Sequence, residues 1–249
     1  MNIVVDDLLV HYEQQGTGST VLLLHGWGDT LAGLSAIQQS LAKQYQVVSV
    51  DLPGFGSSQS PNAVWNLDNY AKFLAAFAKK LDFAPFAIIG HSNGGALAIR
   101  SVSIGALTPE RLVLIAASGI RNSPSLKKSG LKVVAKVGKA ATILLPLRTK
   151  TKLRKKLYGV AGSDLLVVEH LQDTFKATVR QDVQADAANI TIPTLLIYAD
   201  NDAAVPIADG QTYHRLIKSS RLEIIEGAGH FVHLDDPRAV NTLIETFLA

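Results

Sequence analysis

Short, almost wholly apolar runs recur along this chain, separated by longer stretches whose apolar residues have helical spacing. Strands that are apolar throughout are typical of a parallel sheet covered on both faces. The alternation therefore predicts an α/β fold with a doubly wound, mostly parallel sheet. The strands are expected at residues 20–25, 46–50, 86–90, 111–116, 194–199 and 222–225, and residues 3–5 and 8–13 are expected to form an antiparallel hairpin at the sheet edge.

Helix signals lie between the predicted strands. Tyr70, Leu74, Phe77 and Leu81 are spaced as one apolar face, and they follow Asn66, which is a favourable N-cap residue. Further helices are expected at residues 96–103 and 207–217, and a last one with Asp236 as N-cap and Pro237 in its first turn.

Positive charge is concentrated in one segment. The chain has 24 Lys plus Arg and 21 Asp plus Glu, and residues 121–189 contain 14 of the basic and 5 of the acidic residues, a net charge of +9. This segment interrupts the alternation after the sixth predicted strand. We therefore predict a basic helical cap at residues 121–189, inserted into an α/β core formed by residues 1–120 and 190–249.

The predicted cap carries a lysine face. Lys128, Lys132, Lys136 and Lys139 recur at helical spacing beside apolar residues. This pattern is typical of a solvated helix that roofs a pocket. It also suits an anionic partner, either a membrane surface or an acidic acyl carrier protein. Nucleic acid is disfavoured because the segment offers few aromatic side chains for base stacking, and the sequence does not specify an oligomeric state.

Residues 90–94 read Gly-His-Ser-Asn-Gly, between an apolar run and a helix-like stretch. A Gly-x-Ser-x-Gly pattern in this strand, turn and helix context is typical of a nucleophile elbow, which exposes the serine hydroxyl above the sheet. The helix that follows adds partial positive charge at its N-terminus. We therefore predict Ser92 as a catalytic nucleophile.

A serine nucleophile needs a general base and a carboxylate that orients this base. His230 follows the predicted strand at residues 222–225, and Asp202 follows the strand at residues 194–199. Both lie at carboxyl ends of strands, where α/β sheets build their sites. Asp200, in the same loop as Asp202, is a competing candidate for the carboxylate.

Acyl transfer also needs donors for the oxyanion. We predict the backbone N–H groups of Trp27, after the strand at residues 20–25, and of Asn93, next to the nucleophile. His25 is expected to hydrogen bond the loops beneath the site, because no second His or Cys lies at metal-ligand spacing. Structural roles are also expected for His91, His233 and Asp51.

Several classes of protein are excluded or disfavoured. The chain has no Cys, which excludes a Cys nucleophile, thiolate zinc ligands and iron-sulfur clusters. Its first residues lack the basic and apolar regions of a signal peptide. Its best candidate for a membrane span, residues 131–147, is interrupted by lysines. We expect a cytoplasmic protein that requires no cofactor and no metal.

The motifs together make the chain resemble the α/β-hydrolase superfamily from Thr20 to Leu248. The resemblance implies an eight-stranded sheet with a cap after the sixth strand. It favours Asp202 over Asp200, because Asp202 precedes Pro206 as the family's acid does. Residues 25–28 and 51–56 also look like the pimeloyl-acyl-carrier-protein methyl ester esterase branch, although that branch favours Trp where this chain has His91.

The expected activity is cleavage of a small acyl ester through an acyl-enzyme, by a triad of Ser92, His230 and Asp202. Two kinds of alternative stay open. The same scaffold can carry out cofactor-free carbon-carbon bond hydrolysis or perhydrolysis. A ligand-binding, receptor-like protein with low turnover would also retain these residues.

Overall fold

The computed structural model describes residues 1–121 and 169–249. Every predicted run is a strand, and the observed ends lie within two residues of the predicted ones. The strands are β1 (Asn2–Val5), β2 (Leu8–Gln15), β3 (Thr20–Leu24), β4 (Gln46–Val50), β5 (Pro85–His91), β6 (Arg111–Ile115), β7 (Thr194–Ala199) and β8 (Ser220–Ile225).

These strands form one eight-stranded sheet in the order β1-β2-β4-β3-β5-β6-β7-β8. All neighbours from β4 to β8 are parallel, whereas β1 and β2 pair antiparallel at the edge and β2 pairs antiparallel with β4. The prediction of a doubly wound, mostly parallel sheet is therefore confirmed. Because β3, β5, β7 and β8 run parallel, the loops that follow them all emerge at the carboxyl ends of the strands, on one side of the sheet.

Helices cover both faces of the sheet. They are η1 (Leu31–Leu34), α1 (Ser35–Leu41), α2 (Leu67–Lys80), α3 (Asn93–Ser103), η3 (Glu169–Leu171), α7 (Gln172–Arg180), α8 (Gln184–Ala188), α9 (Ile207–Leu216), α10 (Val232–Asp235) and α11 (Pro237–Leu248). Asn66 caps α2, and its side chain accepts from the N–H of Asn69 at 3.1 Å. Asp236 caps α11 in the same way through Ala239, at 3.0 Å. Both N-caps were predicted.

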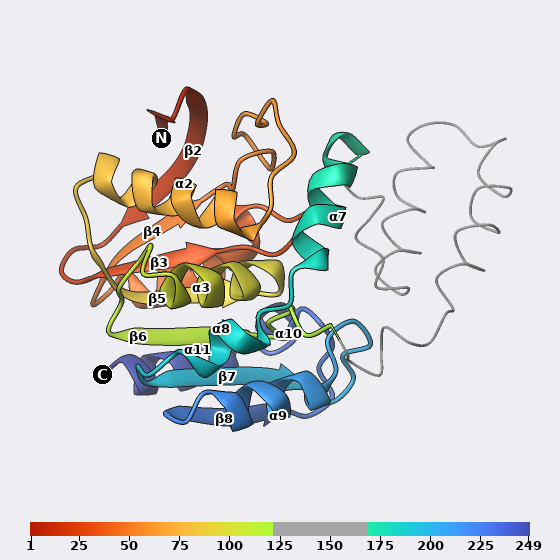
Figure 1. Ribbon diagram of the computed structural model, residues 1–249. Coiled ribbons are helices and arrows are strands. Elements are labelled where there is room, and N and C mark those ends of the chain that lie inside the picture. The colour runs from red at the N-terminus through yellow and green to blue at the C-terminus, as the bar shows by residue number, and fades with distance from the viewer. Residues whose placement is uncertain (122–168) are drawn as a thin grey trace, which may run out of the picture.

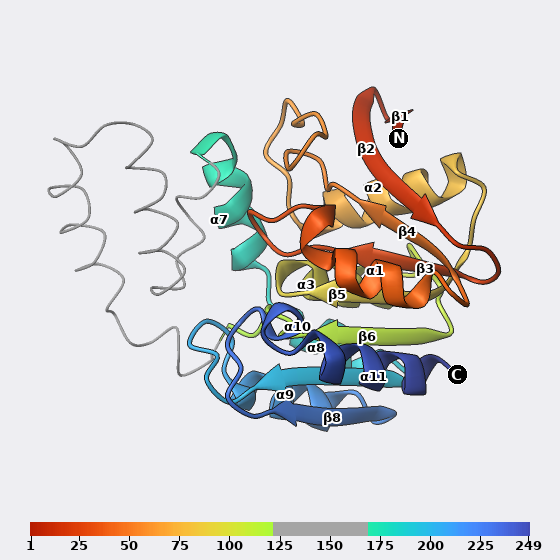
Figure 2. The ribbon, with the colours of Figure 1, turned by 180° about the vertical axis from the view of Figure 1, so that it is seen from behind.

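The alternation of side chains along each strand produces two cores. In β3, Leu22 and Leu24 belong to the core beneath α2, α3 and α9, whereas Val21 and Leu23 belong to the core beneath α1 and α11. Figure 1 shows the first helix layer in front of the sheet, and Figure 2 shows the second from behind. Burial on both faces explains why the central strands, from β3 to β7, are almost wholly apolar.

The chain between β6 and β7 contains the segment predicted as a cap. Its described part includes α7, which lies beyond the carboxyl ends of the strands (Figure 1), and α8, which packs against α3 and α9. Arg100 of α3 fixes this region, because its guanidinium pairs with Asp68 of α2 and with Asp186 of α8, each at 2.7 Å. The predicted lysine face, with Lys128, Lys132, Lys136 and Lys139, lies outside the described residues.

No helix within residues 1–121 and 169–249 combines the length and the apolar character needed to cross a bilayer.

Candidate active site

Ser92 lies at a sharp turn between β5 and α3. It has φ of 51° and ψ of −115°, a backbone conformation that L-residues other than Gly rarely adopt. Two backbone hydrogen bonds stabilise this strained conformation. The Ser92 N–H donates to the carbonyl of Ile115 at 2.9 Å, and the Ser92 carbonyl accepts from the N–H of Ser118 at 3.1 Å. The predicted elbow is therefore present as strand, strained serine and helix.

The glycines of the motif are required by close backbone approach. A Cβ on Gly90 would lie 2.5 Å from the carbonyl oxygen of Gly94. A Cβ on Gly94 would collide with the carbonyl oxygens of Leu24 and His25, at the end of β3. Because these obstacles are backbone atoms, they cannot move aside as a flexible side chain would. The glycines thus allow α3 to start directly against the neighbouring strands.

Three predicted side chains form one hydrogen-bonded chain. His230 Nε2 lies 3.0 Å from Ser92 Oγ, and His230 Nδ1 lies 2.8 Å from Asp202 Oδ2. A carboxylate only accepts, so Nδ1 carries the imidazole proton and Nε2 is left to accept from the serine hydroxyl. The Asp202 side chain is fully buried, and 17% of the His230 side chain is exposed. The three side chains thus lie in the order that the predicted triad requires.

The loop after β7 explains which of the two aspartates reaches His230. Asp202 Oδ1 accepts from the N–H groups of Ala204 and Val205, each at 2.8 Å, which aims Oδ2 at the imidazole. Asp200 instead accepts from the N–H of Gly227 at 2.7 Å and is exposed. The structure thus brings Asp202, and not Asp200, to His230.

The loop after β3 lies against the elbow. A Cβ on Gly26 would be 3.3 Å from Ser92 Cβ, so the backbone that leads to Trp27 passes beside the nucleophile. The indole of Trp27 is held between Phe55 and Phe175, with ring centroids at 4.8 and 5.0 Å. On the other side, Asn93 is the first residue of α3, where N–H groups have no intrahelical acceptor. Both predicted oxyanion donors therefore flank Ser92.

His25 is a neutral structural histidine. Its Nδ1–H donates to the carbonyl of Gly26 at 2.7 Å, and its Nε2 accepts from the N–H of Leu52 at 3.0 Å. Burial lowers its pKa, which favours this neutral form. Asp51 braces the next loop by accepting from the N–H groups of Leu31 and Ser57. These contacts match the structural roles expected for both residues.

A buried histidine pair lies behind His230. The Nε2–H of His91 donates to the carbonyl of His230 at 3.0 Å, and the His91 ring lies 4.5 Å from that of His233. Burial lowers the pKa of His91 well below its ordinary value and lowers that of His233 to about 4. Both rings are therefore neutral near pH 7. The hydrogen bond from His91 supports the backbone of His230. The sequence did not indicate this contact.

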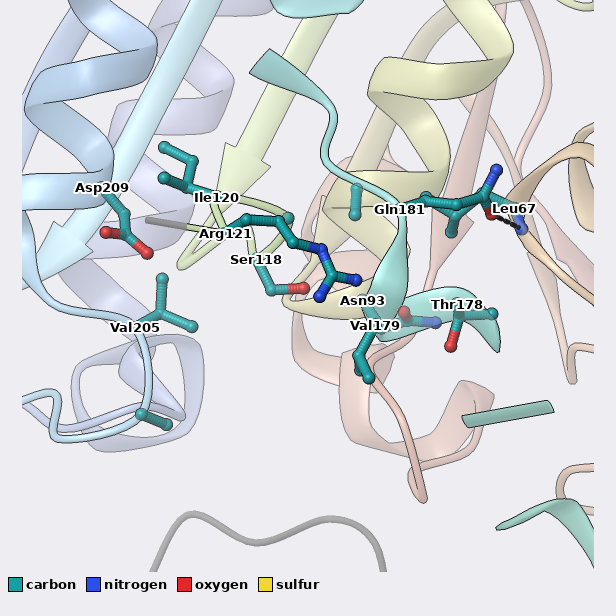
Figure 3. Close-up of a pocket in the computed structure, with 13 residues that line it drawn as sticks. Leu67, Asn93, Ser118, Ile120, Arg121, Thr178, Val179, Gln181, Val205 and Asp209 are labelled. Atoms are coloured by element: carbon teal, nitrogen blue, oxygen red, sulfur yellow. Dashed lines mark hydrogen bonds between the residues drawn. The ribbon is translucent and has the colours of Figure 1, made fainter. Parts of the chain in front are cut away.

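A cavity of about 210 Å³ lies beside the elbow (Figure 3). Its walls come from the start of α3, the loop after β6 at residues 118–121, the end of α7 at residues 178–181 and the loop after β7 at residues 204–205. Asn93 lines it, so it adjoins one of the predicted oxyanion donors. Arg121 extends into it; the sequence places this residue at the start of the predicted basic cap and indicates no role for it in the site.

Within residues 1–121 and 169–249, no group of His, Asp or Glu side chains has the arrangement of a metal site.

The comparison with known proteins identifies the class of the chain. Residues 21–243 match the alpha/beta hydrolase family, and the chain belongs to this family. The predicted superfamily is thereby confirmed, whereas the resemblance to the pimeloyl-acyl-carrier-protein esterase branch stays a prediction.

Three similar proteins illustrate the range of this family. An uncharacterized protein of Mycobacterium tuberculosis is 27% identical over 94% of this chain and 76% of its own length. The 2-hydroxy-6-oxononadienedioate/2-hydroxy-6-oxononatrienedioate hydrolase of Escherichia coli is 28% identical over 97% of this chain and 91% of its own length. A thermophilic esterase from Thermogutta terrifontis has a TM-score of 0.74 and 22% identity over 100% of this chain and 97% of that protein, which shows the shared fold.

Proposed function

We propose that this protein is a serine hydrolase that cleaves carboxylic esters through an acyl-enzyme. The observation that carries the proposal is the hydrogen-bonded chain from Ser92 Oγ through the His230 imidazole to Asp202, at 3.0 and 2.8 Å. An isolated serine hydroxyl is a weak nucleophile, and an adjacent oriented base is the usual means of activating it.

In the first half of the reaction, Ser92 Oγ attacks the ester carbonyl while His230 Nε2 takes the hydroxyl proton. Asp202 holds the imidazole in the required tautomer and stabilises its positive charge. The N–H groups of Trp27 and Asn93 donate to the oxyanion of the tetrahedral intermediate. When this intermediate collapses, the carbon-oxygen bond of the ester breaks, and His230 returns the proton to the departing alcohol.

In the second half, water attacks the acyl carbonyl and His230 takes a proton from this water. Collapse of the second intermediate breaks the bond between the acyl group and Ser92 Oγ, and the proton returns to the serine. The products are a carboxylic acid and an alcohol. No step requires chemistry beyond that of the named groups.

Hydrolysis of a carbon-carbon bond is a second candidate. It is favoured by the similarity to the Escherichia coli hydrolase, whose name gives a substrate with a 6-oxo group and two carboxylates. The same serine, base and oxyanion donors can act on a ketone when the departing carbon is stabilised. Perhydrolysis and ligand binding with low turnover are the remaining alternatives.

The test combines labelling and turnover. Ser92→Ala should abolish hydrolysis of 4-nitrophenyl acetate and butyrate while leaving the fold intact, because the hydroxyl supports no part of the core. Phenylmethylsulfonyl fluoride should label the wild type, and peptide mass mapping should place the adduct on Ser92. A label on another residue, or full activity in the variant, would overturn the mechanism. Labelling without ester turnover would favour the ligand-binding alternative, and turnover of a 6-oxo dienoate alone would favour carbon-carbon cleavage.

A further inference from the structure

Arg121 places a basic group inside the cavity beside the elbow. Its backbone N–H donates to Asp182 Oδ2 at 3.1 Å, which fixes the start of the side chain. From there the side chain enters the cavity that Asn93 and Ser118 also line. In Figure 3 the guanidinium lies towards Asn93 and Val179, whereas the carboxylate of Asp209 lies on the opposite side of the Arg121 backbone. The charged end of Arg121 thus lies on the side of the cavity near the nucleophile.

The guanidinium has unused hydrogen-bond donors. Its Nε and Nη2 atoms are buried and have no hydrogen-bond partner among the described residues. The Asp182 carboxylate does not serve them: it accepts from the N–H of Arg121 and from the backbone and side chain of Gln184. Burial lowers the pKa of Arg121. Buried donors without a hydrogen-bond partner are costly, and folded proteins usually pair them.

The remaining wall of the cavity suits a short carbon chain. Leu67, Ala96, Ile120 and Val205 line it with apolar side chains. A ligand in the cavity would therefore place apolar carbons against this wall, its reacting carbonyl at Ser92 and an anionic group at the guanidinium of Arg121. The planar fork of a guanidinium matches a carboxylate through two parallel hydrogen bonds.

We propose that Arg121 binds a carboxylate of the substrate, so that the enzyme acts on esters that also carry a free carboxylate. This proposal deepens the function proposed above and rests on Ser92 as the nucleophile. Arg121 acts here as a specificity-determining residue: it holds a carboxylate of the substrate while the triad acts on the carbonyl. Neutral esters of the same length would lack this anchor.

A binding experiment tests Arg121 without requiring turnover. Calorimetry should show that Ser92→Ala binds monomethyl glutarate more tightly than the neutral dimethyl glutarate. In the same background, Arg121→Gln should weaken binding of the anionic ligand about 10- to 100-fold, as expected for hydrogen bonds to a charged group. Arg121→Lys, which keeps the charge but loses the fork, should bind with intermediate affinity.

Arg180→Gln is the matched control. Arg180 is exposed at the end of α7 and carries the same charge close to the cavity. Its removal should leave binding unchanged at physiological salt, because exposed charges are screened. An equal loss in the Arg180 and Arg121 variants would assign the effect to general surface charge and overturn the proposal. Circular dichroism and thermal unfolding should confirm that each variant is folded.

Kinetics on ester pairs provide the second test. The pairs are 4-nitrophenyl butyrate against 4-nitrophenyl hydrogen glutarate, and phenyl acetate against 3-acetoxybenzoate, which place the carboxylate on the acyl and alcohol sides respectively. The wild type should prefer the anionic ester of at least one pair in kcat/KM, and Arg121→Gln should lower that ratio about 10- to 100-fold.

The two proposals fail in different ways. Neutral ester turnover with Ser92 labelled, but without a preference for carboxylate that depends on Arg121, would overturn the role of Arg121 and leave the serine hydrolase intact. Arg121-dependent binding of monomethyl glutarate without turnover of any ester would overturn the serine hydrolase and leave Arg121 as a binding residue for carboxylates.

Discussion

The Nε2–H group of His91 donates a hydrogen bond to the backbone carbonyl of His230, at 3.0 Å. His91 directly precedes Ser92, and the imidazole of His230, the proposed base, accepts from Ser92 Oγ. One buried side chain therefore ties the elbow to the loop that carries the imidazole. This contact with the backbone of His230 adds to the contact that Asp202 makes with its imidazole.

We expect His91→Phe to lower kcat about tenfold or more with little change in KM, because a displaced base misaligns proton transfer without removing substrate contacts. His91→Gln should retain more activity, since its amide can donate from nearly the same position. Steady-state kinetics with 4-nitrophenyl butyrate would measure both variants. Equal losses in the Phe and Gln variants would show that the ring acts through packing rather than through its N–H.

Asp202→Asn should cost far more activity than Asp200→Asn. The Asn variant keeps an oxygen for the N–H groups of Ala204 and Val205, so the loop is retained. Its amide cannot accept from His230, and the wrong tautomer lowers kcat about 10⁴-fold in the serine protease triad. Asp200 contacts Gly227 and not the imidazole, so its variant is the control. The reverse order of activities would reassign the acid.

The sequence could predict the centre of the sheet because β3 to β7 are buried on both faces and are therefore almost wholly apolar. It did not predict α1, whose inward face includes Gln38, a buried polar side chain that accepts from Ser49 Oγ at 2.9 Å. This hydrogen bond depends on a residue of β4, the next element of the chain, so the spacing of apolar residues within α1 does not reveal it.

The residues of the candidate site also divide into those that the sequence predicts and those that it does not. Ser92, Asp202 and His230 follow strands, and parallel strands bring their carboxyl ends to one edge, so their approach followed from strand order. The positions of His91 and Arg121 depend instead on side-chain direction. The charge of Arg121 indicated a solvated cap, whereas its side chain enters the cavity. The spacing of residues in the sequence does not indicate this direction of the Arg121 side chain.

Gly94→Ala should destabilise the protein and lower its activity. The new Cβ would meet the carbonyl oxygens of Leu24 and His25, and relief requires α3 to move away from β3. Overpacking of this kind costs about 1–3 kcal/mol, and the shift separates Ser92 from the Trp27 loop. Gly229→Ala is the control, because its nearest atom would lie at 3.5 Å. Urea unfolding and kcat/KM should both separate the two variants, and equal stabilities would contradict the packing argument.

The last prediction concerns the loss of stability in acid. His233 is 1% exposed, and burial lowers its pKa to about 4 from an ordinary value near 6.5. Between these values the unfolded chain binds a proton at this site and the folded protein does not. The free energy of unfolding should therefore be unaffected above pH 6.5 and fall as the pH drops towards 4, by roughly 3 kcal/mol from this group.

Urea unfolding of the wild type, His233→Leu and His214→Gln at pH values from 7 to 4.5 measures this contribution. His214 is exposed on α9 and serves as the control. Carboxylates titrate in all three proteins, so the difference in slope between variants isolates the histidine. His233→Leu should show a shallower loss of stability in acid, whatever its stability at pH 7, while His214→Gln should keep the wild-type slope. A wild-type slope in His233→Leu would mean that protonation of His233 does not oppose folding. Part of the slope should persist in that variant, because burial lowers the pKa of the neighbouring His91 in the same direction.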